Sequence, residues 1–119
     1  MIIRKNSSSI YFRRRRLSEE ENYNLLVQFI FKTCNYDERS QTKLYFLYNT
    51  YLEWLDNTPH RKTIPVGRNK FYKEIEKVLQ LLKEDIEENT GFALEGFLIQ
   101  ERPFYSVKNL RFDHHMLDG

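Results

Sequence analysis

The sequence predicts an α+β fold in which three amphipathic helices precede a C-terminal β-hairpin. Apolar residues recur at helical spacing in three successive segments, and two short aromatic and β-branched stretches near the end of the chain flank a polar turn. The order helix, helix, turn, helix, hairpin is the layout of a winged helix, whose second and third helices form a helix-turn-helix. We accordingly expect a basic arm or linker at residues 1–16, a winged-helix domain at 17–112 and a tail at 113–119.

The first helix is expected over residues 18–34. Ser18 is followed three residues later by Glu21, which is the spacing of a capping box, and acidic residues here suit the positive end of a helix dipole. The apolar stripe that follows consists of Tyr23, Leu26, Phe29 and Ile30. Cys34 is expected to be a small buried residue rather than a nucleophile, because no histidine and acid stand in an arrangement that would activate it.

The second helix is expected over residues 41–56, after a polar connector at 35–39 and with Ser40 as its N-cap. This helix contains a row of tyrosines for which stacking on nucleic-acid bases is one interpretation: Tyr45, Tyr48 and Tyr51. Such a row, at helical spacing beside leucines, is more typical of core or half-buried packing, and we interpret it in that way.

The third helix is expected within the stretch from residue 65 to residue 82. Pro65 and Gly67 stand just before its first turn, where the chain enters the helix. Its apolar stripe consists of Phe71, Ile75, Val78, Leu79 and Leu82. Beyond Lys83 the sequence becomes acidic, and carboxylates near the C-terminus of a helix oppose its dipole. We therefore expect regular helix to weaken between residues 83 and 89.

The hairpin is expected to consist of strands at residues 96–99 and 104–107, joined by a polar turn at 100–103. Leu110 and Phe112 would extend the second strand. In a winged helix this hairpin is the wing, which contacts phosphates or the adjacent minor groove.

The net charge of +2 hides an uneven distribution. Residues 1–16 and 57–73 carry Lys and Arg without any acid, whereas residues 84–101 carry six acids without any Lys or Arg. Two basic segments and one acidic segment imply a strongly polar surface field.

The exposed side of the third helix carries the residues expected to contact a DNA groove: Arg68, Asn69, Lys70 and Lys73. Asn69 is the candidate base reader, because its amide can pair with adenine through two hydrogen bonds. Cations in the preceding loop and in the hairpin are expected to bind phosphates: Arg61, Lys62, Arg102, Lys108 and Arg111. The run Arg13–Arg16 belongs either to an arm that binds DNA phosphates or to a solvated terminus.

Several of these residues together form a recognisable pattern. It comprises Leu44-Tyr45 through Tyr51, Trp54 and Leu55, a basic turn, Ile64-Pro65-Val66-Gly67, Phe71 and Ile75, then Phe97-Leu98-Ile99, Tyr105-Ser106-Val107 and Leu110. Over residues 24–112 it resembles the C-terminal winged-helix domain of viral primase-helicases, the superfamily III helicases of poxvirus and phage type. The chain departs from that pattern in its acidic segment and at Gly67, where the family often has a hydroxyl residue that caps the helix.

The resemblance implies a function in DNA replication. It implies binding to origin or fork DNA, as part of or partner to a helicase whose ATPase domain lies in the same or another chain. It further implies a viral protein that acts in the host cytoplasm.

Two other binding functions stay open. A protein-interaction winged helix would use the acidic segment and the aromatic hairpin to dock a partner, since the fold does not fix the function. A small transcription regulator would be expected to dimerise.

We expect no enzymatic activity, cofactor, metal or small-molecule substrate. The phosphate-binding motif GxxxxGK[ST] is absent, and His114 and His115 would face opposite ways on a strand. A single cysteine allows no internal disulfide.

No apolar run approaches the roughly 20 residues that span a membrane, so we expect a soluble cytoplasmic protein with no membrane partner.

Overall fold

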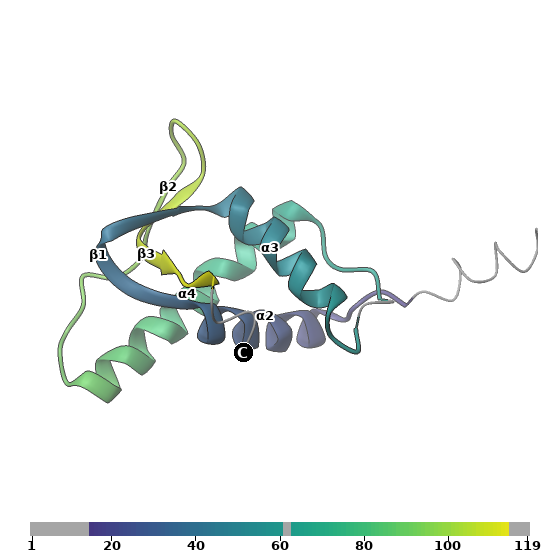
Figure 1. The fold of residues 1–119 in the computed structure, drawn as a ribbon, viewed down its shortest axis with the longest axis horizontal. Coiled ribbons are helices and arrows are strands. Elements are labelled where there is room, and N and C mark those ends of the chain that lie inside the picture. The colour runs from purple at the N-terminus through teal and green to yellow at the C-terminus, as the bar shows by residue number, and fades with distance from the viewer. Residues whose placement is uncertain (1–14, 61–62, 115–119) are drawn as a thin grey trace, which may run out of the picture.

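The computed structural model describes residues 15–60 and 63–114, which form an α+β fold with three helices and a three-stranded antiparallel sheet (Figure 1). In chain order the elements are α2 (Glu19–Thr33), β1 (Cys34–Lys43), α3 (Leu44–Asp56), α4 (Arg68–Thr90), β2 (Leu98–Gln100) and β3 (Ser106–Phe112). The strands are ordered β1-β3-β2. The predicted α+β class is therefore confirmed, and this arrangement is compatible with a winged helix.

Helix α2 begins at the predicted capping box. The Ser18 hydroxyl accepts a hydrogen bond from the Glu21 backbone N–H at 3.1 Å, and the Glu21 carboxylate accepts one from the Ser18 N–H at 3.1 Å. Arg15 donates two further hydrogen bonds to the same carboxylate. These contacts fix the start of α2, which ends at Thr33, one residue before the predicted boundary.

Glu21 should make the stability of the protein sensitive to acid. Hydrogen bonds from Arg15 and Ser18 lower the pKa of this carboxyl from 4.5 to about 2. Because the folded-state pKa is the lower one, the stabilisation is complete above about pH 4.5 and is lost as the pH falls through 2. Urea unfolding at several pH values should give a smaller acid-induced loss of stability for Glu21→Gln than for the parent chain. An equal loss in both proteins would contradict this assignment.

The predicted polar connector at residues 35–39 is wrong, because the structure places strand β1 there. In Figure 1, β1 curves from the end of α2 to the start of α3. It pairs with β3 in two stretches, from Cys34 opposite Phe112 and from Gln41 opposite Lys108. Ser40 therefore does not cap the second helix, which begins at Leu44 after Lys43. The strand forms because β3, a distant segment, supplies its backbone hydrogen-bond partners.

A bulge interrupts the pairing of β1 and β3 between Tyr36 and Gln41. Asn109, in β3 beside the bulge, has φ 73°, a left-handed conformation that Asn tolerates better than most residues. Its side-chain amide donates a hydrogen bond to the Gly96 carbonyl oxygen at 2.8 Å. This bond ties β3 to the segment that leads into β2.

The predicted weakening of the third helix is also wrong, because α4 continues to Thr90. The acidic turns are stabilised by side-chain contacts, including Lys83 to Glu87 at 3.3 Å. The other Glu87 carboxylate oxygen accepts a hydrogen bond from the Leu94 N–H at 2.7 Å. Gly91 then ends the helix at φ 77°, with its N–H donating to the Glu87 carbonyl. These contacts offset the unfavourable interaction of the acids with the helix dipole.

The predicted hairpin is confirmed, with β2 paired to β3 from Leu98 opposite Lys108 to Gln100 opposite Ser106, but both strands begin two residues later than expected. Leu110 and Phe112 extend the second strand as expected. The turn between the two strands contacts the start of α3, where the Leu44 N–H donates a hydrogen bond to the Tyr105 carbonyl at 3.1 Å.

The core lies between the three helices and one face of β3. Its fully buried residues include Leu26, Phe29, Ile30, Leu47, Tyr51, Phe71, Ile75, Val78, Val107 and Leu110. The Tyr51 hydroxyl donates a hydrogen bond to the Asn22 side-chain oxygen at 2.9 Å, and burial raises the pKa of Tyr51. Cys34 is buried as predicted, which raises the pKa of its thiol to about 12 and keeps it protonated at neutral pH.

The segment before α2 is tied to the loop before α4. The Ile64 N–H donates to the Arg15 carbonyl at 2.8 Å, and the Leu17 N–H donates to the Ile64 carbonyl at 3.1 Å. The Tyr48 hydroxyl holds the same loop through the Val66 carbonyl at 3.1 Å. These bonds fix the point from which α4 begins.

Among the described helices, none has the length and hydropathy to cross a membrane.

Candidate nucleic-acid interface

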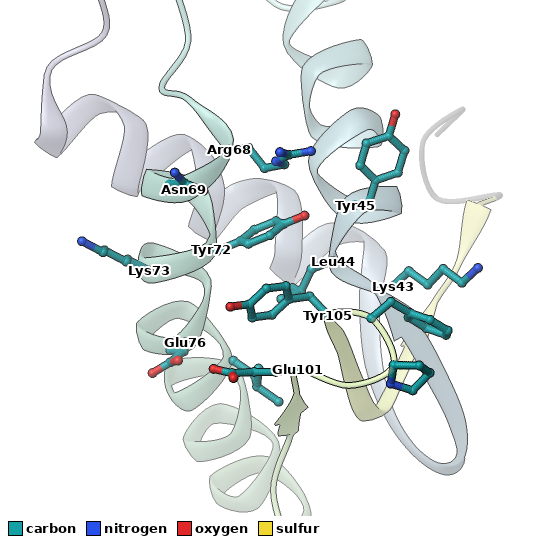
Figure 2. A pocket seen from close by; sticks show the side chains of 13 residues that line it. Lys43, Leu44, Tyr45, Arg68, Asn69, Tyr72, Lys73, Glu76, Glu101 and Tyr105 are labelled. Carbon is teal, nitrogen blue, oxygen red and sulfur yellow. The ribbon is translucent and has the colours of Figure 1, made fainter.

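An open hollow of about 820 Å³ lies between the first turns of α4, the start of α3 and the β2–β3 turn (Figure 2). Its lining combines cations, acids and aromatic rings: Lys43, Leu44, Tyr45, Arg68, Asn69, Tyr72, Lys73, Glu76, Ile99, Glu101, Pro103, Phe104 and Tyr105. Three of the predicted groove-contacting residues, Arg68, Asn69 and Lys73, are therefore brought together with the hairpin.

Aromatic side chains are unusually exposed around this hollow. Tyr45 is 58% exposed, and Phe104 and Tyr105 are each 45% exposed. Tyr72 is half-buried, with its ring centroid 5.4 Å from that of Tyr105. Burial raises the pKa of Tyr72, so its hydroxyl stays protonated at neutral pH and is able to donate a hydrogen bond.

Two cations of α4, Arg68 and Lys73, are exposed and make no ion pair with any described residue. Arg68 extends toward Tyr45 on α3, whereas Lys73 points to the opposite side of α4 (Figure 2). Lys43 lies over the Phe104 ring, with its Nζ atom 4.6 Å from the ring centroid. Unpaired cations of this kind are free to bind an anionic ligand without first breaking a salt bridge.

Lys70 lies apart from the other predicted α4 cations. Its ammonium group contacts the Glu19 carboxylate of α2 at 2.7 Å and that of Glu74 at 3.9 Å. Lys70 does not line the hollow. The physical reason is helical phase, because two residues along a helix turn a side chain by roughly 200°, away from Arg68.

Arg111 is likewise engaged within the protein. It contacts Asp113 at 2.9 Å and Asp37, in the bulged part of β1, at 3.6 Å. Both carboxylates raise the pKa of Arg111, with Asp113 contributing most. Arg111 would have to leave these partners before it could bind a phosphate.

The remaining predicted phosphate contacts have different positions. Arg102 in the hairpin turn and Lys108 on β3 are exposed, and neither forms an ion pair with a described residue. Arg61 and Lys62 lie outside the described residues, as do residues 1–14 of the predicted basic arm. Arg15, from the arginine run, is held by Glu21.

The part of the chain that the structure describes contains no group of three His, Cys, Asp or Glu residues that could hold a metal. His114 packs its ring against Phe46 and Phe112, at centroid distances of 5.4 and 4.9 Å. His115 lies outside the described residues.

A family model described as poxvirus D5 protein-like matches residues 20–111. The chain belongs to the poxvirus D5 protein-like family. This confirms the resemblance seen in the sequence and supports a viral, replication-related domain. No curated protein and no solved structure matches the chain significantly.

The D5-like match extends from α2 to β3 and so includes every residue lining the hollow. Within it, sequence reasoning missed the exposed aromatic residues. The interpretation of the tyrosine row as packing is right for Tyr51, which is buried, and for Tyr48, which is half-buried, but wrong for Tyr45. Helix geometry could have predicted this difference. Each step of three residues falls about 60° short of a full turn, so Tyr45 and Tyr51, two such steps apart, point in different directions.

Proposed function

We propose that this D5-like chain is a DNA-binding winged helix that acts in viral-type DNA replication, alongside a helicase ATPase domain in the same or another chain. The element order helix, strand, helix, helix, strand, strand supports this assignment. In it, α3 and α4 form the helix-turn-helix and the β2–β3 hairpin is the wing. The proposed role is binding rather than catalysis, and its site of action is the cytoplasm of the host cell.

The observation that carries the proposal is that two cations of α4, Arg68 and Lys73, line the hollow and make no ion pair with a described residue. Phosphates bind such residues with release of counterions. No side chain caps the start of α4, where Gly67 is the N-cap residue, so the positive end of the helix dipole adds to the field of these cations. Asn69 lies between the two cations in sequence and is also exposed, which suits a contact to a base edge.

The test is a binding titration of the full chain with a fluorescently labelled DNA oligonucleotide over a range of salt concentrations. The proposal predicts binding whose logarithmic affinity falls linearly with the logarithm of salt concentration, with a slope of about −0.7 to −0.9 per phosphate contact. Absence of binding at low salt, or an affinity that does not depend on salt, would contradict it.

Docking of a partner protein is the second candidate function. Phe92 favours it, because this residue is 74% exposed directly after the acidic end of α4. In Figure 1 this end of α4 extends beyond the other helices. A pull-down of a helicase ATPase domain that requires residues 84–112 but tolerates alanine at Arg68 and Lys73 would favour this function over DNA binding.

A further inference from the structure

We infer that the aromatic hollow formed by Tyr45, Tyr72, Phe104 and Tyr105 binds the unpaired bases of single-stranded DNA. This inference rests on the proposed function and specifies its ligand. It differs from insertion of α4 into the major groove of a duplex, which the helix-turn-helix order by itself favours.

Three of the rings are exposed around the same hollow. Tyr45, Phe104 and Tyr105 come from α3 and from the β2–β3 turn, yet all three lie around one hollow with roughly half of each residue exposed. Large apolar rings gathered on a surface mark a binding site. Bases in a duplex present only their edges, because stacking covers their faces, whereas unpaired bases present faces that stack on aromatic side chains.

Positive and negative side chains lie at different ends of the hollow. Arg68 extends from α4 toward Tyr45, and Lys43 lies beside Phe104 at the start of α3 (Figure 2). Glu76 and Glu101 lie at the other end of the hollow. Because carboxylates repel phosphates, the sugar-phosphate backbone is directed past Arg68 and Lys43, and its bases face the rings.

The size of the hollow suits this ligand. Its volume of about 820 Å³ and its open mouth leave room for about one or two nucleotides. The Tyr72 and Tyr105 rings, 5.4 Å apart and tilted by 48°, already contact each other and form one wall. Tyr45 is the most exposed of the four, and Phe104, unlike Tyr105, does not contact a second ring among the described residues, so Tyr45 and Phe104 are the expected stacking surfaces.

The experiment compares the affinity of the full chain for a labelled oligothymidylate of about 20 nucleotides with its affinity for a duplex of the same length, by fluorescence anisotropy. Tighter binding of the single strand is expected. Tyr45→Ala and Phe104→Ala should each weaken single-strand binding by roughly 10-fold, whereas Phe92→Ala, at an exposed aromatic residue outside the hollow, should leave it unchanged. Tyr45→Phe retains the ring and should bind like the parent chain, which separates stacking from loss of fold.

A second readout reports stacking directly. A 2-aminopurine base in the oligonucleotide should lose fluorescence on binding to the parent chain and lose less with Tyr45→Ala. Preferential binding of the duplex, or single-strand affinity unaffected by Tyr45→Ala and Phe104→Ala, would overturn the inference and leave DNA binding by α4 intact. Failure to bind either oligonucleotide would overturn both the inference and the proposed function.

Discussion

Replacing Phe71 with alanine is expected to lower the free energy of unfolding by about 3–5 kcal/mol. Phe71 is fully buried, and its ring lies 5.2 Å from that of Tyr48 and 5.5 Å from that of Tyr51. These contacts join α4 to α3, so a cavity at this position separates the two helices of the proposed helix-turn-helix. Because small domains have total stabilities of about 5–15 kcal/mol, the variant should be largely unfolded under mild denaturing conditions.

Urea unfolding followed by circular dichroism measures this effect. Phe31→Ala is the matched control, because it makes the same substitution on α2 at a residue that is 38% exposed. We expect the control to lose less than about 1 kcal/mol. Similar losses in the two variants would contradict the assignment of Phe71 to the centre of the core.

Replacing Arg68 and Lys73 together with alanine is expected to reduce the salt dependence of DNA binding. Each lost phosphate contact lowers the slope of logarithmic affinity against logarithmic salt concentration by about 1, so the double variant should lose about 2. Both residues are exposed and make no ion pair with any described residue, so the substitutions should leave the fold unchanged. Anisotropy titrations at several salt concentrations give the slope directly.

Lys70→Ala is the matched control on the same helix. Lys70 is already paired with Glu19, and this contact raises the pKa of its ammonium group. We therefore expect Lys70→Ala to leave the slope almost unchanged. An exposed ion pair contributes little to stability, so the control should also remain folded. A loss of slope with Lys70→Ala but not with the double variant would move the DNA-binding surface to the α2 side of α4.

Local signals were sufficient to predict three helices and the hairpin. The spacing of Ser18 and Glu21 predicts the start of α2 because both partners of each capping bond lie within four residues. The buried stripe from Phe71 to Leu82 predicts α4 in the same way, since its periodicity is local. The C-terminal extent of α4 was missed because it depends on the pairing of Lys83 with Glu87 and on the Gly91 cap, rather than on the helix dipole alone.

Strand β1 could not be predicted from its own residues. Its segment contains mostly polar side chains with no alternation, and few of them are buried, notably Cys34 and Thr42. The segment is a strand because β3, about 70 residues later, pairs with it and because the Thr42 hydroxyl donates to the Leu110 carbonyl at 2.7 Å. Sequence patterns within a short window do not contain such long-range information.

The candidate site was predictable only in part for the same reason. Helical spacing placed Arg68, Asn69 and Lys73 on an exposed surface of α4, where the structure also has them. It gave no indication that Lys70 would pair with Glu19, because that carboxylate lies 51 residues earlier on another helix. The contribution of Phe104 to the hollow likewise depends on how the hairpin packs beside α4, which is a tertiary property.

Chemical-shift mapping of the ¹⁵N-labelled full chain during titration with DNA tests most directly whether this surface binds nucleic acid. The account predicts that the largest amide shifts occur at the start of α4, from Arg68 to Lys73, together with the start of α3 and the β2–β3 turn. Shifts confined to the acidic end of α4 and to Phe92, or no shifts at low salt, would contradict it.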